Sequence, residues 1–359
     1  MELFPNLPSD IGFECLVRVP YDHFPTVGSV CKSWNLEIQL PEFMNQRKAA
    51  GFTRNVIVLS QARVNSTGSK AGSTLKVHAT PAYRLAIFEP ETGHWTELPP
   101  VPGFADGLPM FCQLVGVGLN LVLMGGLDPV SWEVSNSVFV FSFLTATWKR
   151  GADMPGCKRS FFSCASDSDR TVFVAGGHDD EKNALRSALA YDVENDHWVE
   201  LPDMACERDE SKGVFHNGKF HVIGGYSTNM QGRFSASAEA FDVTTWKWDP
   251  FEDDFLEAST CPRTCTSVAP DGRLLMCRDA DVLEVKNAKW QALAQLPNDV
   301  RNIAYVTATS RGNLLVIGSP RFSEPHQVYM LDLKRYTWTK LEMPEIFSGH
   351  VQSGSCLEM

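Results

Sequence analysis

The segment Tyr191-Asp-Val-Glu-Asn-Asp-His-Trp198 decides the fold, because its pattern returns five more times along the chain. In each copy a large apolar residue precedes a tryptophan by seven positions, and in five of the six copies Asp or Glu follows that apolar residue. The six tryptophans are Trp95, Trp148, Trp198, Trp248, Trp290 and Trp338, at intervals of 53, 50, 50, 42 and 48 residues. A repeat of this length predicts an array of similar structural units.

Paired glycines lie upstream of three of these segments. Gly125-Gly126, Gly176-Gly177 and Gly224-Gly225 each end a run rich in Val, Leu, Ile and Phe. Glycine is favoured at a strand end where two backbones approach closely or where φ is positive. The fifth and sixth units keep the apolar run, at 274–277 and 314–317, without the glycine pair. A second apolar strand and a tight hairpin into the tryptophan strand follow.

The period, the glycine pair and the later tryptophan together resemble the kelch repeat, whose units are four-stranded blades of a β-propeller. The resemblance implies an all-β propeller, and six tryptophan strands imply six blades. The first blade has little room for a strand before 55–60, whereas residues 349–358 read as one strand after the last blade. We expect this C-terminal strand to close the first blade, because closure removes exposed strand edges.

The first forty-odd residues lack the repeat and read as a small all-α segment. Apolar residues recur at spacings of three and four, which predicts short helices, and Pro20 and Pro25 separate them. A segment of about 45 residues buries its apolar stripes poorly by itself and therefore needs a partner surface. We divide the chain into a helical docking part, residues 1–48, and a propeller, residues 49–359.

This helical part resembles the F-box. The residues that carry the resemblance are Leu7-Pro8, Cys15-Leu16, Val19-Pro20 and Val30-Cys31-Lys32-Ser33-Trp34. Cys15 and Phe24 depart from the usual Ile and Leu. The resemblance implies docking on a Skp-family adaptor, which bridges to a cullin. The adaptor-binding residues that it implies are Leu7, Pro8, Ile11, Leu16, Val19 and Pro20, with Val30 and Trp34 behind them.

An F-box followed directly by kelch repeats is typical of a large plant family. The stretches 58–64, 160–168, 174–179 and 220–227 resemble the KISS ME DEADLY subgroup, which directs degradation of phenylalanine ammonia-lyase. The resemblance implies the substrate-recognition subunit of a Skp-cullin-F-box (SCF) ubiquitin ligase that sends this enzyme to the proteasome and so restrains phenylpropanoid metabolism. The same ligase role on type-B response regulators of cytokinin signalling, or on chalcone synthase, is an alternative.

The target-binding face is expected at the loops between the second and third strand of each blade. These loops are 61–82, 127–137, 178–187, 226–238 and 320–327. Arginines near the start of the innermost strands would suit a carboxylate-bearing peptide or an acidic surface, unless each arginine pairs with a nearby acid. The candidate target-binding residues are Arg159, Arg208, Arg263, Arg301, His178 and Tyr226.

Charge and composition argue against several other classes. The net charge of −11 disfavours phosphate-backbone binding and anionic membrane surfaces, so no nucleic-acid or membrane partner is expected. Neither a signal peptide nor an apolar run of membrane-spanning length is evident. The ten cysteines are then expected to be reduced thiols in a cytoplasmic or nuclear protein.

No catalytic residue, metal site or cofactor is expected. His178-Asp179-Asp180-Glu181 reads as a solvated loop rather than a metal site, and Cys261 and Cys265 lack a second pair. No nucleophile-elbow or phosphate-loop pattern appears. We therefore expect a non-catalytic subunit that holds its target near a ubiquitin-charged enzyme. A kelch scaffold without a ligase role, and a kelch-fold copper oxidase, are the alternative classes.

Overall fold

The computed structural model describes residues 3–4, 6–64, 81–268, 271–322 and 324–359. The N-terminal part consists of α1 (Ser9–Val17), η1 (Tyr21–His23), α2 (Phe24–Val30), α3 (Lys32–Gln39) and α4 (Pro41–Ala49). Pro41 is the first residue of α4, where its fixed φ and missing N–H are tolerated. Cys31 has extended backbone angles and separates α2 from α3.

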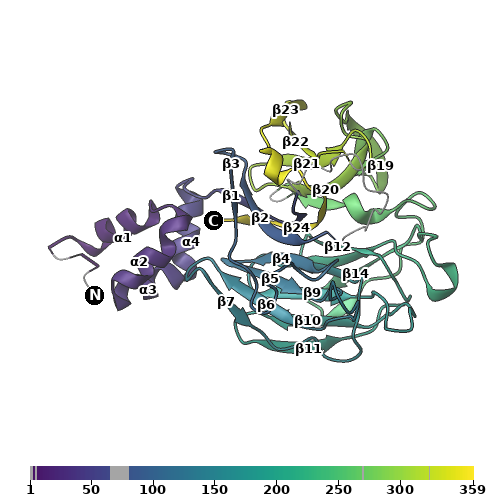
Figure 1. Cartoon of the computed structure of the whole chain (residues 1–359), viewed down its shortest axis with the longest axis horizontal. Helices are drawn as coiled ribbons and strands as arrows, with labels where there is room; N and C mark the ends of the chain where they lie inside the picture. Colours follow the sequence, from purple (N-terminus) through teal and green to yellow (C-terminus); the bar gives the residue numbers. More distant parts are fainter. Residues whose placement is uncertain (1–2, 5, 65–80, 269–270, 323) are drawn as a thin grey trace, which may run out of the picture.

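The rest of the described chain forms six four-stranded sheets around a central axis, drawn from blue to yellow in Figure 1. The predicted six-bladed propeller is confirmed. From the axis outward, blade 1 contains β24 (Val351–Glu358), β1 (Asn55–Ala62), β2 (Tyr83–Glu89) and β3 (His94–Glu97). Blade 2 contains β4 (Gln113–Val117), β5 (Asn120–Met124), β6 (Val138–Ser142) and β7 (Thr147–Arg150).

The other four blades follow the chain in order. Blade 3 contains β8 (Ser163–Ser166), β9 (Thr171–Ala175), β10 (Ala188–Asp192) and β11 (His197–Leu201). Blade 4 contains β12 (Lys212–His216), β13 (Lys219–Ile223), β14 (Ala238–Asp242) and β15 (Lys247–Trp248). Blade 5 contains β16 (Thr266–Val268), β17 (Arg273–Arg278), β18 (Asp281–Lys286) and β19 (Lys289–Gln295). Blade 6 contains β20 (Asn302–Ala308), β21 (Asn313–Ser319), β22 (Gln327–Asp332) and β23 (Thr337–Leu341).

The two ends of the propeller sequence meet in blade 1. Strand β24 pairs antiparallel with β1, in a register that runs from Asn55 opposite Glu358 to Gln61 opposite Val351. The expected closure of the first blade by the C-terminal strand is therefore confirmed. Because both the first and the last strand of the ring lie in one sheet, neither leaves an unpaired edge at the seam.

The glycine pairs have a steric cause. All six of their glycines have positive φ, between 62° and 94°. A Cβ added to the second glycine of each pair would lie within 3 Å of a carbonyl oxygen in the segment that leads into the innermost strand, as at Gly177, where it would lie 2.4 Å from Ser160 O. Only glycine combines this backbone angle with this close approach.

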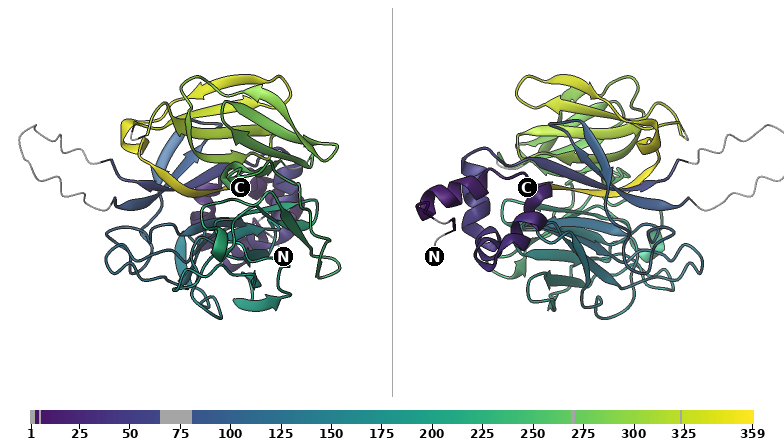
Figure 2. Two further views of the ribbon diagram at one scale, coloured as in Figure 1. Left: turned by 90° about the vertical axis from the view of Figure 1, so that its right-hand side faces the viewer. Right: turned by 60° about the vertical axis from the view of Figure 1, so that its left-hand side comes forward.

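The helical part packs against one end of the propeller (Figure 2). Tyr21 donates from its hydroxyl to Glu89 at the end of β2 at 2.6 Å, and its ring meets Phe143 edge-on. Lys48 of α4 forms a 2.8 Å ion pair with Glu358 of β24. Apolar side chains of the helices form one buried cluster with those of blades 1 and 2, so the two parts share a core.

Candidate partner-binding faces

The propeller has two ends, which differ in the chain segments that form them. The helix face carries the helical part and the turns that join first to second and third to fourth strands. The loop face, at the opposite end, carries the loops that join second to third strands, after β1, β5, β9, β13, β17 and β21. The expected target-binding loops therefore lie on the face away from the helices. Residues 65–80 of the first loop lie outside the described residues.

The predicted adaptor-binding residues are exposed to different degrees. Pro8, Pro20, Ile11 and Val30 are exposed, the last two at 48% and 57%. Leu7, Val19 and Trp34 are half-buried, and Trp34 donates from Nε1 to Leu3 O at 2.6 Å. Leu16 is 1% exposed and packs in the core, so it supports this surface from behind. Leu36 and Leu40, which the sequence analysis did not single out, are also exposed, at 63% and 47%.

Two of the four candidate arginines are buried and hold the chain itself together. Arg208 forms a 3.0 Å ion pair with Glu239 and donates to Gly224 O at 2.7 Å. Arg159 makes the corresponding hydrogen bond to Gly176 O in blade 3, at 3.2 Å. Both side chains are internal, at 2% exposure or less, so in this structure neither guanidinium faces a partner. The alternative of pairing with a local acid holds for Arg208, although the acid is Glu239 and not a sequence neighbour.

Arg263 and Arg301 are exposed at the loop face, where each side chain makes one hydrogen bond to another described residue. Arg263 donates to Ile303 O at 3.3 Å, and Arg301 donates to Asn298 Oδ1 at 3.4 Å. Both acceptors are uncharged, so neither bond neutralises the positive charge of a guanidinium group. These two arginines therefore keep the capacity to meet a carboxylate.

His178 lies between Ser160 and Asp209. Its Nε2 is 2.8 Å from Ser160 Oγ, and its Nδ1 is 2.8 Å from Asp209 Oδ2. This geometry resembles a serine-histidine-aspartate relay, but Ser160 is only 1% exposed and has no room for a substrate. Backbone bonds in both directions also join Ser160 to His178. The hydrogen bonds of these three residues therefore join the segments that lead into the innermost strands of blades 3 and 4.

Tyr226 and two phenylalanines surround the inner rim of the loop face. Tyr226 donates from its hydroxyl to Glu210 at 2.8 Å. Phe111 and Phe161 contact each other with ring centroids 4.9 Å apart, and Phe161 stacks on His178. Phe111, Phe161 and Glu210 precede the innermost strand at the same position in blades 2, 3 and 4, and all three have φ between 50° and 59°. Left-handed backbone also recurs in the turns between third and fourth strands, at Ala146, Asp196, Trp246 and Tyr336, so it belongs to the turns of the repeat.

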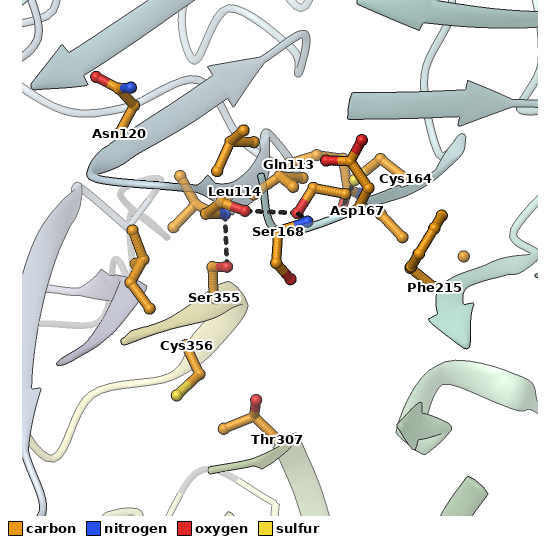
Figure 3. A pocket seen from close by; sticks show the side chains of 18 of the residues that line it. Gln113, Leu114, Asn120, Cys164, Asp167, Ser168, Phe215, Thr307, Ser355 and Cys356 are labelled. Atoms are coloured by element: carbon orange, nitrogen blue, oxygen red, sulfur yellow. Dashed lines mark hydrogen bonds between the residues drawn. The ribbon is translucent and has the colours of Figure 1, made fainter. Parts of the chain in front are cut away.

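A channel of about 1310 Å³ runs between the innermost strands. Figure 3 shows side chains around it, with Gln113 and Cys164 on one side and Ser355, Cys356 and Thr307 on the other. Residues of α3 and α4 line it at the helix face. Lys212, which was not among the residues expected from the sequence, begins β12 and lines the same channel. Its place as first residue of an innermost strand could have been found by aligning the repeats.

Comparison with known proteins agrees with this architecture. The kelch motif matches residues 111–155 and 159–205, which contain blades 2 and 3. Over its whole length the chain is 52% identical to two proteins of Arabidopsis thaliana, F-box/kelch-repeat protein At1g80440 and F-box/kelch-repeat protein At1g15670, each fully covered. It is also 36% identical to F-box/kelch-repeat protein At2g44130 of the same plant, with 74% of this chain and 69% of that protein aligned.

The structure is a closed kelch propeller with a small helical part packed on one face. It therefore belongs to the class of propeller proteins that carry an N-terminal helical module. The chain belongs to the plant F-box/kelch-repeat family. Among the described residues, no helix is long and apolar enough to cross a bilayer, and no group of three or more potential metal ligands comes together.

Proposed function

We propose that this chain is the substrate-recognition subunit of an SCF ubiquitin ligase. The observation that carries the proposal is the placement of two exposed apolar surfaces at opposite ends of one joined body. Ile11, Val30 and Leu36 lie exposed on the helical part, and Val130, Trp132 and Phe322 lie exposed on the loop face, at 88%, 57% and 87%. Exposed aromatic anchors of this kind are enriched where proteins bind other proteins.

In this function the two parts have separate tasks. Residues 1–48 dock on the Skp-family adaptor and, through it, on a cullin, whereas residues 49–359 select the target. The contacts of Tyr21 and Lys48 with the propeller hold the target-binding face at a fixed distance from the adaptor. A fixed geometry raises the effective concentration of the target near the ubiquitin-charged enzyme, so the subunit needs no nucleophile of its own. The work would take place in the cytoplasm or nucleus, to which the ten free thiols are suited.

For the target, we propose phenylalanine ammonia-lyase, on the resemblance of the stretches 160–168 and 220–227 to the subgroup that degrades it. The function would then be negative regulation of phenylpropanoid metabolism. Type-B response regulators of cytokinin signalling and chalcone synthase are the other targets that the resemblance allows. Parallel ubiquitination assays with each purified candidate decide between them.

The ligase role is tested by affinity purification of the full chain under proteasome inhibition. We expect the Skp-family adaptor and cullin to co-purify, and Leu7→Ala with Pro8→Ala to remove both while target capture persists. The matched control is Val64→Ala, which changes an exposed apolar residue at the loop face. Adaptor binding that survives the double substitution, or an adaptor complex without cullin, would contradict the ligase role and favour a scaffold.

A further inference from the structure

Four basic side chains, two of which line the channel, lie near one another toward the loop face. Lys212 and Arg263 line the channel from blades 4 and 5. His326 lies in the loop between β21 and β22, and His350 directly precedes β24. The two imidazole rings are 5.5 Å apart between centroids. The positive charge of Arg263 acts on both Lys212 and His350, so the four residues form one electrostatic group, which we call the basic mouth.

No carboxylate in the described part of the chain forms an ion pair with any member of the basic mouth, although Glu210 lines the same channel. Among the described residues, no acidic group contributes to the pKa shift of Lys212, His326 or His350. Within the part of the chain that the structure describes, the side chain of Arg263 donates only to a backbone carbonyl, that of Ile303. Of the two acids nearest before Lys212 in the sequence, Asp209 pairs with His178, and Glu210 accepts a hydrogen bond from the uncharged Tyr226 hydroxyl.

The cost of this arrangement appears in the pKa values. Burial, and to a smaller extent Arg263, lowers the pKa of Lys212, although two thiols raise it in part. Burial and the charge of Arg263 also lower the pKa of His350. Burial and then His350 lower the pKa of His326 to about 4. Each of these groups is therefore harder to charge, and an anion placed among them would favour its charged form.

A hydrogen-bonding atom in the same place also lacks a partner. Nδ1 of His326 is buried and accepts or donates no hydrogen bond to any described residue. Buried polar atoms in folded proteins are nearly always paired, so one without a partner calls for an explanation. A structural role explains Arg159 and Arg208, which hold glycine carbonyls in place, but Lys212 makes no such bond within the described chain.

We propose that the basic mouth binds a carboxylate-bearing segment of the target protein, with Lys212 and Arg263 as its charge partners. The identity of the partner rests on the proposed function, whereas the site itself does not. The channel is wide enough to admit side chains of such a segment, and Phe111 and Phe161 border it with apolar surface. Carboxylates can come from acidic side chains or from a chain terminus, and both suit one ammonium and one guanidinium group.

Fluorescence anisotropy with the full chain tests the site directly. The probes are fluorescein-labelled hexaglutamate with an amidated C-terminus, hexaglutamine with a free C-terminal carboxylate, and amidated hexaglutamine. We expect the wild type to bind at least one carboxylate probe and not amidated hexaglutamine. Lys212→Met with Arg263→Gln should weaken that binding at least tenfold. Binding of hexaglutamate assigns the site to acidic side chains, and binding of the free-carboxylate probe assigns it to a terminus.

The matched control is Lys334→Gln with Arg335→Gln, which removes two exposed charges from the turn between β22 and β23, away from the loop face and outside the channel. This control should bind within twofold of the wild type, and equal melting temperatures show that both variants fold. Failure of both carboxylate probes to bind, or equal losses in the two double variants, would overturn the proposal.

Co-purification separates this proposal from the proposed function. If the Lys212→Met/Arg263→Gln variant keeps the adaptor and cullin but loses the target, both stand. If it keeps the target as well, the basic mouth is not the recognition site although the ligase role stands. If the wild type retains neither adaptor nor cullin, the ligase role fails, and the anisotropy result alone decides the site.

Discussion

The indole Nε1 of Trp95 donates a 3.1 Å hydrogen bond to the carbonyl oxygen of Glu342, which lies 247 residues further along the chain. The other five repeat tryptophans make the same bond to the blade before their own. Their acceptors are Pro99, Ala152, Pro202, Phe255 and Gln295, at 2.6 to 2.9 Å. Only Trp95 has to reach the last blade, so this bond and the pairing of β24 with β1 together complete the ring.

The C-terminal strand should be essential to stability. Deletion of residues 349–359 removes the innermost strand of blade 1 and the buried side chains of Val351 and Leu357. We expect the melting temperature to fall by roughly 10 °C or more, since each lost side chain costs a few kcal/mol. Calorimetry measures the loss, and a synthetic 349–359 peptide added in trans should restore part of it. An unchanged melt of the truncated chain would refute this account of closure.

The glycine pairs predict a contrast between two alanine substitutions. Gly177 has φ +83° and an added Cβ would meet Ser160 O at 2.4 Å, whereas Gly156 has φ +80° and open space around it. Gly156→Ala should cost about 1 kcal/mol from backbone strain alone. Gly177→Ala should cost about 3 kcal/mol, because strain and overpacking add. Urea unfolding measures both, and equal losses would show that the close approach does not matter.

The buried ion pair of Arg208 and Glu239 should behave unlike a surface pair. Arg208→Met leaves Glu239 buried without its charge partner, which typically costs about 3–5 kcal/mol. The surface pair of Arg186 and Asp203 provides the control, and Arg186→Gln should cost about 1 kcal/mol or less. Adding Glu239→Gln to Arg208→Met should recover part of the loss. The absence of recovery would mean that the hydrogen bond of Arg208 to Gly224, rather than the ion pair, carries the stability.

The joint between the helical part and the propeller depends on Tyr21. Burial, then its hydrogen bond to Glu89, raises the pKa of Tyr21, so the hydroxyl stays a donor at all physiological pH values. Tyr21→Phe removes that donor and should cost about 1–2 kcal/mol. Hydrogen exchange should show faster exchange in α1 to α4, with the propeller unchanged. Tyr336→Phe, at an exposed site, is the control and should alter neither region.

Stability should fall in mild acid because of buried histidines. Burial, followed by the charge of nearby His216, lowers the pKa of His221 in blade 4 to about 4, whereas an unfolded histidine titrates near 6.5. Between these values the unfolded chain binds more protons, so the stability present above about pH 6.5 is lost as pH falls toward 4. This group alone should remove about 2 kcal/mol between pH 7 and 5.

The control for this prediction is His221→Gln, which has no titrating group at the position. Its free energy of unfolding, measured with urea at both pH values, should fall less than that of the wild type. The free energy of unfolding of the variant still falls with pH, because burial also lowers the pKa of His326 to about 4. Identical slopes in wild type and variant would show that His221 does not titrate as described.

Much of the fold could be predicted because its signals are local and repeated. The six repeated tryptophans predicted the number of blades. The lack of a strand at the start of blade 1 predicted that residues 349–358 supply it. The candidate sites were harder to predict. Arg159 and Arg263 occupy similar places in the repeat, yet one is internal and the other is exposed. Their surroundings come from other blades, which no single repeat encodes.

The sequence by itself determined the units, their number and the order in which they assemble, because strand periodicity, turns and the tryptophan frame act within about 50 residues. Only the tertiary structure decided which charged side chains form ion pairs inside the ring and which do not. Arg208 finds Glu239 in its own blade, whereas Lys212, Arg263 and His350 come from three blades and form no ion pair with any described carboxylate. Ring closure brings those residues together, and their pairing depends on distances that only closure sets.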